Sequence, residues 1–469
     1  MKTKTPHQIT TRLISHLCLA FACTLVAVGG ATVQAAGHRA TSITLTYAGW
    51  DPPDILGDIV APCLKQLPGV NVKLQFIPQN GYEAKLQTDF AAGVAPDVFY
   101  SLEYDALKWA KAGDIINQLP RLKQLGVSVS NILPAAQWWY KGQYLGTSSS
   151  ITDLVLYYNK VVFKQAHVAT PPADVAHAWT WPQFVRVAEE LTIDNKRRHP
   201  YDAGFDPNHI ERYGVTFGGT DWFHLLPLVY SNGGNVLDAA NRHFAMNQPV
   251  AADAIQAWAD LANKYHVMPT PTESASGAGS ISLASQRVAM QFDGTYMLWF
   301  FQHTSHDTRS TAAFPLGMGV LPKFKQYRTD IAGTGMVAYA HSAHPQQALQ
   351  LAMCISATGG KSFADAKAIQ RRIFKEGIGI PNQYALLTGA NYKLWAANAF
   401  HPATFRTAAI DTLKYAPEQV PYKTTTQFGT IWNTLITPAL DQVINGQTSA
   451  RAALNGIAPQ ANALLAQGQ

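Results

Sequence analysis

Strand-like and helix-like segments alternate along residues 43–112, and this order most constrains the fold. Three short segments with the alternating or apolar pattern of strands each precede a segment with helical spacing. The strand-like segments are residues 43–47, 70–77 and 96–101, and the helical ones are residues 54–67, 82–92 and 105–112. The order β-α-β-α-β-α favours a parallel sheet with helices on both faces. Ligands of such sheets collect at the carboxyl ends of strands, so a candidate site is expected near Trp50 and Tyr100.

Two helix starts have the spacing of a capping box, in which a side chain and a Glu or Gln three residues later bond to each other's backbone. They are Asn80 with Glu83 and Thr180 with Gln183. Further strands are expected at residues 154–158, 288–292 and 331–340, and the chain after residue 345 is expected to be mainly helical.

The size and charge of the chain exclude several classes of protein. At about 150 residues per domain, 469 residues suffice for two or three domains. Charged residues are 14% and hydrophobic residues 47%, whereas ordinary soluble proteins have about 25% charged residues, so disorder is excluded. The net charge is +6, and half of it comes from Lys2, Lys4 and Arg12. Because the remaining surplus is small for so long a chain, we expect no nucleic-acid or anionic-membrane partner.

The N-terminus has the three parts of a secretory signal peptide. Basic residues precede an apolar stretch at residues 13–28, and small residues follow up to Ala35. We therefore predict export to the periplasm or the outer cell surface, with cleavage near Ala35. A membrane anchor is the less favoured alternative, because a span needs about 20 apolar residues. A lipid anchor on Cys23 is disfavoured because Ala20 stands where lipoprotein signals have Leu.

Only Cys63 and Cys354 remain after the signal segment. An even pair in an oxidising compartment is able to form a disulfide. The two cysteines lie far apart in sequence and in helix-like contexts, however, so two separate buried thiols are the favoured prediction.

A series of short segments follows in a fixed order along the rest of the chain. They comprise Tyr82-x-x-Lys85-Leu86 and residues 90–98, 112–114, 142–146, 156–160, 180–181, 213–214, 287–296, 321–322 and 446–454. In content, order and spacing they resemble the family 1 extracellular solute-binding proteins of ABC importers, which include maltose-binding and other sugar-binding proteins.

The resemblance implies an α/β protein with the two-lobed periplasmic-binding-protein fold of class II type, in which a hinge joins the lobes and the ligand lies in a cleft between them. On this basis we expect a signal peptide at residues 1–35, an N-terminal lobe of residues 36–150 and 294–343, and a C-terminal lobe of residues 151–293 and 344–469.

A sugar receptor needs aromatic rings that cover C–H faces and polar groups that bind hydroxyls, because each unmatched hydroxyl would cost about 1–3 kcal/mol. Combined with the resemblance, this requirement selects twelve candidate ligand-binding residues. They are Trp50, Asp97, Tyr100, Glu103, Asp153, Trp222, Tyr296, Gly333, Thr334, Gly335, Trp395 and Arg406.

Several candidates have a structural interpretation as well. Trp50 and Trp222 are equally compatible with packing inside a lobe, and Asp97 with capping a local turn. Gly333 and Gly335 would let backbone amides approach a ligand, but close packing of the lobes explains them equally well.

Taken with the resemblance, these features predict a non-enzymatic receptor that binds a mono- or oligosaccharide and delivers it to the membrane permease of an ABC importer. We expect a monomer without cofactor or metal. Two alternatives stay open. One is a receptor for another solute, such as a polyamine, a glycerol phosphodiester or an iron chelate. The other is a secreted carbohydrate-active enzyme, which would need two carboxylates about 5–10 Å apart.

Overall fold

The computed structural model describes residues 42–276, 281–302, 314–356, 377–397, 400–417 and 420–468. The predicted signal peptide and its cleavage site lie outside these residues. In the described part of the chain, no helix combines the length and the hydropathy that a membrane span requires.

The alternation predicted at the start of the chain is confirmed. The elements are β1 (Ile43–Gly49), α1 (Pro53–Leu64), β2 (Val70–Phe76), α2 (Tyr82–Ala92), β3 (Val98–Ser101) and α3 (Glu103–Ala112). Strand β1 lies between β2 and β3 and runs parallel to both, as the right-handed β-α-β connection requires. The carboxyl ends of β1 and β3 therefore lie at one edge of the sheet.

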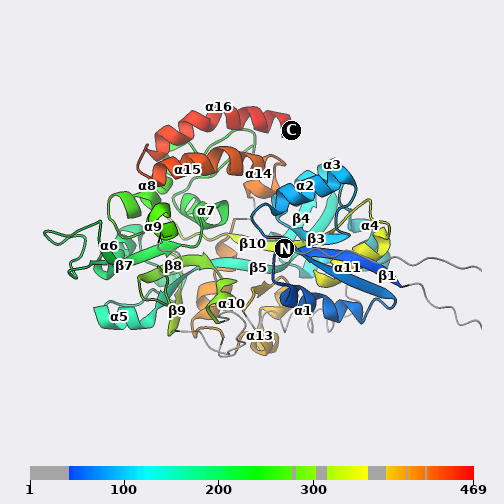
Figure 1. Cartoon of the computed structure of the whole chain (residues 1–469), viewed down its shortest axis with the longest axis horizontal. Helices are drawn as coiled ribbons and strands as arrows, with labels where there is room; N and C mark the ends of the chain where they lie inside the picture. Colours follow the sequence, from blue (N-terminus) through cyan, green and yellow to red (C-terminus); the bar gives the residue numbers. More distant parts are fainter. Residues whose placement is uncertain are drawn as a thin grey trace, which may run out of the picture. The chain divides into compact units, whose positions relative to one another are not determined.

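Two later strands connect this parallel part to the rest of the sheet (Figure 1). Strand β5 (Gln143–Asn159) is long enough to pair with β10 (Ile331–Ala338) through one half and with β8 (Val288–Gly294) through the other. Strand β10 is antiparallel to both β3 and β5. The strand order is β2-β1-β3-β10-β5-β8-β7-β6, so the sheet is mixed rather than purely parallel.

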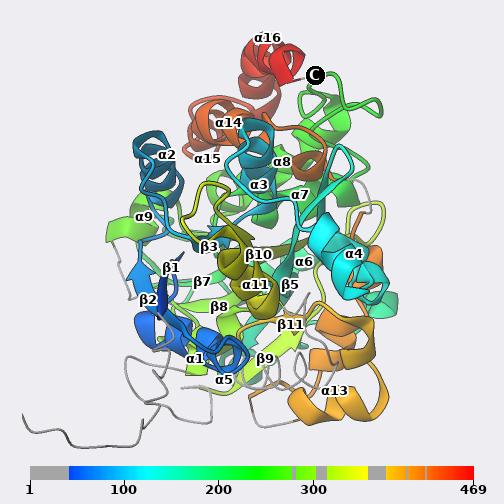
Figure 2. The same cartoon turned by 90° about the vertical axis from the view of Figure 1, so that its right-hand side faces the viewer.

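The remaining elements complete the mixed α/β architecture. The other strands are β4 (Gln137–Tyr140), β6 (Ile193–Asp194), β7 (Ile210–Phe217), β9 (Leu316–Gly319) and β11 (Ile380–Pro381). The helices of the middle region are α4 (Leu119–Leu125), α5 (Lys160–Ala166), α6 (Trp181–Leu191), α7 (Trp222–Ser231), α8 (Pro249–Asn263), α9 (Pro271–Ser276) and α10 (Met297–Gln302). The later helices are α11 (Pro345–Ile355), α13 (Gly389–Trp395), α14 (Phe428–Ile431), α15 (Thr437–Ile444) and α16 (Ala450–Gly468). Helices α15 and α16 lie against α8 (Figures 1 and 2).

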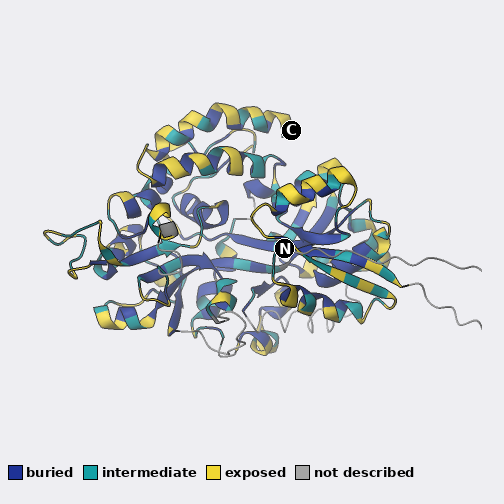
Figure 3. Cartoon of the chain, viewed as in Figure 1, coloured by how far each residue is buried: buried dark blue, intermediate teal, exposed yellow. Residues whose placement is uncertain are grey.

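Two separate hydrophobic cores form the interiors of the two lobes. Figure 3 colours the residues by burial and shows that most of the sheet is buried. The N-terminal core contains side chains from β1, β3, α1, α3, β10 and α11, such as Phe99, Trp109 and Leu351. The C-terminal core contains side chains from β5, β8, α6, α7, α8 and the last helices, such as Phe184 and Trp258. The fold is thus the two-lobed α/β class expected from the sequence.

Two segments pack in the lobe opposite to the one expected. The expectation placed residues 294–343 in the N-terminal lobe and residues 344–469 in the C-terminal lobe. Residues 314–321 contribute side chains to the C-terminal core, and residues 348–355 of α11 contribute to the N-terminal core. The reason is the course of β10, whose first residues join the C-terminal core and whose last residues join the N-terminal core.

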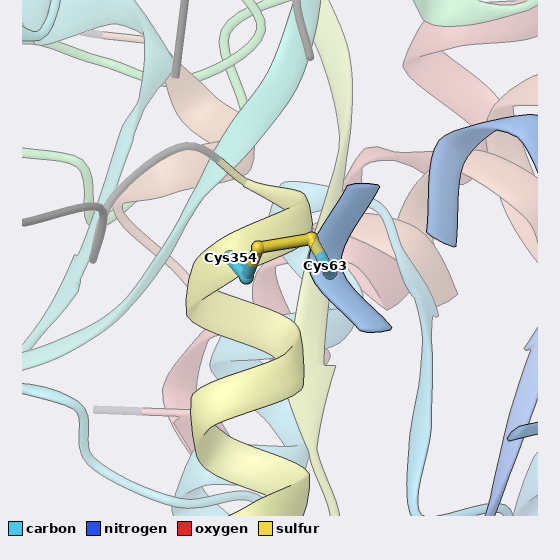
Figure 4. The surroundings of a disulfide bond; sticks show 2 residues. All are labelled: Cys63 and Cys354. Atoms are coloured by element: carbon cyan, nitrogen blue, oxygen red, sulfur yellow. A yellow bond between two sulfur atoms is a disulfide. The ribbon is translucent and has the colours of Figure 1, made fainter. Parts of the chain in front are cut away.

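Cys63 of α1 and Cys354 of α11 form a disulfide, and the prediction of two separate thiols is wrong (Figure 4). They are 291 residues apart in sequence, but their Cα atoms are 5.8 Å apart. Strand β10 returns beside β3, and α11, which follows β10, then packs against α1. The disulfide therefore links the start of the lobe to the segment that completes it.

One of the two predicted capping boxes forms. The Thr180 hydroxyl accepts a hydrogen bond from the Gln183 backbone N–H, and the Gln183 side chain accepts one from the Thr180 N–H at 2.9 Å. At α2 the prediction is wrong, because Gly81 takes the N-cap position with a φ of +85° and no side chain caps the helix.

Candidate functional site

Aromatic and acidic side chains meet where β1 and β3 end. The Trp50 ring lies edge-on to Tyr82 and Tyr100, with centroids 4.9 and 5.1 Å away. The Tyr100 hydroxyl donates to the Asp51 carboxylate at 2.6 Å, and burial raises the pKa of both groups. At Gly49, an added Cβ would lie 2.9 Å from Leu56 and 3.1 Å from the Tyr100 ring, so the glycine permits this close packing. The structure thus brings together two predicted site residues, Trp50 and Tyr100.

The start of α3 contributes an acid and an aromatic ring. Glu103 is fully buried, and neither carboxylate oxygen has a hydrogen-bond partner among the described residues. The nearest cation is the Lys423 ammonium, 3.9 Å from Oε1. Burial raises the pKa of Glu103 to about 7, although the charge of Lys423 opposes this shift. Such an acid has unused capacity to accept hydrogen bonds.

An aromatic cluster joins elements of the two lobes. Tyr104 of α3 contacts Trp222 of α7 and Phe428 of α14, with centroids 6.2 and 5.8 Å away. Trp222 lies 4.3 Å from the Tyr422 ring and is only 6% exposed. We call Glu103, Tyr104, Trp222, Tyr422, Lys423 and Phe428 the interlobe cluster, because α3 belongs to the N-terminal core and the other elements to the C-terminal core.

Trp222 reaches this position because Asp221 starts helix α7. The Asp221 carboxylate accepts from the backbone N–H of Phe223 at 2.9 Å and also from that of His224. Trp222 is therefore the first residue of the helix, and the loop before it contains Gly218 and Gly219. The charge of Asp221 also acts on Tyr104, whose pKa is raised mainly by burial. A carboxylate thus lies close to the aromatic cluster.

A second buried acid, Asp293, lies near the start of α7 and accepts hydrogen bonds through both carboxylate oxygens. His224 contacts Asp221 at 3.0 Å through Nδ1 and Asp293 at 3.4 Å through Nε2. Tyr296 and Gln291 donate to Asp293 at 2.7 and 2.8 Å. Burial opposes protonation of His224, but the two carboxylates outweigh it and raise the pKa of His224 to about 10. The histidine is therefore a cation that donates to both acids. Tyr296, a predicted site residue, belongs to this network.

The glycine loop before α7 permits this arrangement. A Cβ at Gly218 would lie only 1.9 Å from the Asp293 carboxylate oxygen, so any larger residue would displace the acid. Glu103, Asp51 and the aromatic rings provide the two kinds of contact that a neutral polyhydroxyl ligand requires: acceptors for hydroxyl groups and flat apolar faces.

Two predicted residues make structural contacts instead. Asp97 accepts from the Thr46 backbone and hydroxyl at 2.7 and 2.8 Å and also from the Ser342 hydroxyl, which ties β1 to the start of β3. Asp153 is fully buried, and its carboxylate accepts from the Thr329 and Thr412 hydroxyls. Burial raises the pKa of Asp153 to about 7, against these two bonds. Neither carboxylate contacts the interlobe cluster through these bonds.

The three candidates of β10 lie inside the sheet, where β10 pairs with β5 and β3. A Cβ at Gly333 would lie 2.4 Å from the Ser150 carbonyl oxygen, and one at Gly335 would lie 2.2 Å from the Trp138 ring. Close strand packing therefore explains both glycines. Thr334, between them, pairs with Ser150.

Trp395 and Arg406 are not brought to the interlobe cluster. Trp395 is buried in the C-terminal core and donates to the Leu386 carbonyl at 2.7 Å. Arg406 donates to Asp411 and to the Leu387 carbonyl, both at 2.9 Å.

Sequence reasoning missed several residues of this region. Tyr104 follows the predicted site residue Glu103 directly, and His224 lies two residues after the predicted site residue Trp222, so both had a positional signal. Tyr422 and Lys423 had none, because they come from a segment expected only to be helical. Asp330 is also buried there and accepts from the Tyr422 hydroxyl at 2.6 Å; burial raises the pKa of Asp330 to about 8. In the described residues, no group of three His, Cys, Asp or Glu side chains is arranged to hold a metal ion.

Fold and site together define a class: two-lobed α/β binding proteins whose lobes share a cluster of aromatic and acidic side chains. Residues 55–360 match the sequence model of the bacterial extracellular solute-binding proteins, and the chain belongs to this family. Because the family is extracellular, membership implies export.

Solved structures with the same fold cover almost the whole chain. A substrate-binding protein of an ABC transporter from Listeria monocytogenes, in complex with cycloalternan, has a TM-score of 0.75 at 21% identity and covers 91% of this chain and 99% of its own. A solute-binding protein from Thermotoga lettingae, bound with α-D-tagatose, has a TM-score of 0.70 at 20% identity, with 90% and 100% covered. A maltose/maltodextrin-binding domain from Bdellovibrio bacteriovorus, bound to maltotriose, has a TM-score of 0.68 at 17% identity, with 91% and 99% covered.

Proposed function

We propose that this protein is the receptor of an ABC importer, which binds a mono- or oligosaccharide between its lobes and delivers it to the membrane permease. The observation that carries the proposal is the contact of Trp222 with Tyr104 of the other lobe, beside the unsatisfied carboxylate of Glu103. The sugars bound by the three similar structures support the same ligand class.

The roles of the side chains follow from their surroundings. Trp222, Tyr104 and Trp50 supply rings that cover the C–H faces of a sugar. Glu103 and Asp51 accept hydroxyl donors, and Lys423 donates. The bonded set of His224, Asp293 and Tyr296 holds the start of α7 in place. Of the twelve candidates we retain Trp50, Tyr100, Glu103, Trp222 and Tyr296, and we leave the other seven out of the proposed site.

Binding is coupled to lobe closure in this proposal. Because α3 and α7 belong to different lobes, a ligand that contacts Tyr104 and Trp222 at once binds the closed form more tightly. The ligand thereby shifts the population toward the closed form, which the permease recognises. We place the lobe crossings in β5 and β10, the two strands that pair with each other and contribute to both cores.

The proposal includes export through a signal peptide cleaved near Ala35, release to the periplasm or outer cell surface, a monomeric state and no catalysis, cofactor or nucleic-acid partner. A receptor for a polyamine, a glycerol phosphodiester or an iron chelate is the alternative from the same family. A carbohydrate-active enzyme is the alternative from another class.

A thermal-shift screen of the exported chain tests these alternatives. The panel contains glucose, maltose, maltotriose, tagatose, a xyloside, trehalose and cycloalternan, with spermidine, a glycerol phosphodiester and a ferric chelate as the non-sugar arm. A sugar present at 100 times its dissociation constant adds about 2.7 kcal/mol of stability and raises the Tm. A Tm shift with only a non-sugar ligand would overturn the ligand class, and sustained cleavage of an oligosaccharide by the purified protein would overturn the receptor.

A further inference from the structure

A second pocket lies in the C-terminal lobe, away from the interlobe cluster. It has a volume of about 470 Å³ and is lined by residues from the ends of α5 and α6, from β6 and β7, and from the loop between these two strands. Figure 1 shows α5, α6 and β7 at one end of the molecule, and α6 packs against both of the others. We call it the α5–α6 pocket. Within the described residues, its lining shares no member with the interlobe cluster.

The lining of the α5–α6 pocket has a net positive charge. Arg197 and Arg212 line it, against Glu190 as the one acid among the lining residues. Glu190 is already paired, because Arg186 lies 3.3 Å from its carboxylate. Burial and the charge of Arg197 lower the pKa of Arg212, so the two guanidinium groups repel each other across the pocket. A negatively charged ligand would relieve this repulsion.

Asp194 holds the loop that carries Arg197, and it forms its ion pair with Arg198 instead of Arg197. The fully buried Asp194 carboxylate accepts from the backbone N–H groups of Lys196, Arg198 and Asp206 at 2.8, 2.9 and 3.1 Å. It also binds the Arg198 side chain at 2.6 Å, which leaves the charge of Arg197 for the pocket. Arg197 itself has a φ of +61°, a left-handed conformation that is unfavourable for a non-glycine residue. The loop is thus fixed in a strained form that places the arginine in the lining.

Other groups of the lining are also pre-oriented. The Arg212 Nε donates to the Leu191 carbonyl at 2.9 Å, which fixes the guanidinium group while its terminal nitrogens stay available. His199 Nδ1 donates to the Thr192 carbonyl at 2.9 Å, which fixes the orientation of the imidazole ring. The Tyr201 ring stacks on His199 with centroids 5.2 Å apart and an interplanar angle of 16°. This pair adds a flat wall to the pocket.

We propose that the α5–α6 pocket binds a small organic molecule with at least two negative charges, a phosphate monoester or a polycarboxylate of about the size of a sugar phosphate. Guanidinium groups bind phosphate and carboxylate oxygens in pairs, so Arg197 and Arg212 hold the charged group. The stacked rings of His199 and Tyr201 contact the remainder of the molecule. A volume of about 470 Å³ is within the range of small-molecule sites and exceeds what inorganic phosphate alone would fill.

Calorimetric titration of the exported chain with glucose 6-phosphate and with citrate tests this site. We expect 1:1 binding of at least one of the two anions, with an affinity that falls as the salt concentration rises. The double variant Arg197→Gln/Arg212→Gln should bind that anion at least about tenfold more weakly, because it loses two charge-assisted contacts. Arg451→Gln is the matched control. It removes one exposed cation of α16, which pairs with Asp253 at 3.3 Å, and should leave anion binding unchanged.

The two probes also distinguish the two ligand sources. Tighter binding of glucose 6-phosphate identifies a phosphate ester, and tighter binding of citrate identifies a polycarboxylate. Uncharged glucose is titrated in parallel, and any glucose binding that the double variant retains belongs to the proposed interlobe site. The double variant should fold, since it removes a repulsion, and its melting curve checks this. Absence of binding by both anions, or equal binding by the wild type and the folded double variant, would overturn the proposal.

Discussion

Two buried acids of the interlobe region, Asp293 and Glu103, differ in how their oxygens are satisfied. Asp293 of the C-terminal lobe accepts from Tyr296, Gln291 and the Gly294 backbone and faces the cationic His224. Glu103 of the N-terminal lobe is equally buried, but among the described residues neither of its carboxylate oxygens accepts a hydrogen bond. The Lys423 ammonium, 3.9 Å away, and the Trp138 side chain lower its pKa against the effect of burial. A saturated acid of this kind stabilises the frame of the site, whereas an unsaturated one keeps its acceptors for a ligand. The variants of His224 and Glu103 and the pH dependence of the two side chains test this difference.

The variant His224→Leu should have the largest effect. It leaves Asp293 buried without its cation, and breaking such a pair costs about 3–5 kcal/mol of the free energy of unfolding. Urea denaturation followed by circular dichroism measures the loss. A loss below about 1 kcal/mol would show that the saturated network does not stabilise the frame.

Removal of the disulfide should destabilise the lobe that carries Glu103 without changing either acid. The double variant Cys63→Ser/Cys354→Ser is expected to lose about 2–4 kcal/mol in urea denaturation, because the unfolded chain is no longer cross-linked. Ligand affinity should change less than threefold. Unchanged stability would indicate that the exported protein does not carry this bond.

The variant Glu103→Gln should affect binding rather than folding. It replaces a charged acceptor by a neutral one, and hydrogen bonds to charged groups contribute about 1.5–3 kcal/mol, so affinity for the bound sugar should fall at least about tenfold. Asp97→Asn is the matched control, because Asp97 already binds Thr46 and Ser342, and its affinity should stay near that of the wild type. Calorimetry measures both affinities. Equal affinities of the wild type and Glu103→Gln would contradict the proposal that Glu103 accepts hydrogen bonds from the sugar.

The two acids also predict a difference in pH dependence. Burial raises the pKa of Glu103 to about 7, above its ordinary value of 4.5 in the unfolded chain. Between these values the native state holds a proton that the unfolded state has lost, so stability falls as pH rises from about 5 to 7. Relative to Glu103→Gln, the free energy of unfolding of the wild type should fall by about 1 kcal/mol for each pH unit in this range. Parallel stability curves for the two proteins would contradict this pKa shift.

His224 acts at higher pH. Its pKa of about 10 in the folded protein exceeds the ordinary value of 6.5, so its contribution to stability is complete below about pH 6.5 and is lost as pH rises toward 10. The variant His224→Leu should therefore show a flatter stability curve than the wild type between these two pH values.

Local sequence patterns were enough to predict most of the architecture. The spacing of apolar residues predicted β1 to α3, and this spacing depends on near neighbours in the sequence. The two lobes followed from the family resemblance that the order of short motifs carries. Trp50 and Tyr100 were selected because they lie at predicted strand ends, and Trp222 because it follows a glycine loop.

Pairings between distant segments were not predictable in the same way. The disulfide depends on the return of β10 beside β3, which places two cysteines 291 residues apart in contact. Asp97 has the sequence context of a site residue, but Thr46 and the distant Ser342 occupy its carboxylate. Tyr422 and Lys423 reach the site only because the last helices pack onto the C-terminal core, and no local pattern marks them.

Calorimetric titration of the exported wild-type chain and of Trp222→Ala with each sugar of the panel tests the central claim most directly. We expect one sugar per chain in the wild type and a loss of at least about 30-fold in affinity for Trp222→Ala, since truncation of a buried aromatic anchor costs about 2 kcal/mol or more. Trp139→Ala, which removes a ring of β4 that is 40% exposed, should bind as the wild type does. Sugar binding that survives unchanged in folded Trp222→Ala would contradict an interlobe sugar site.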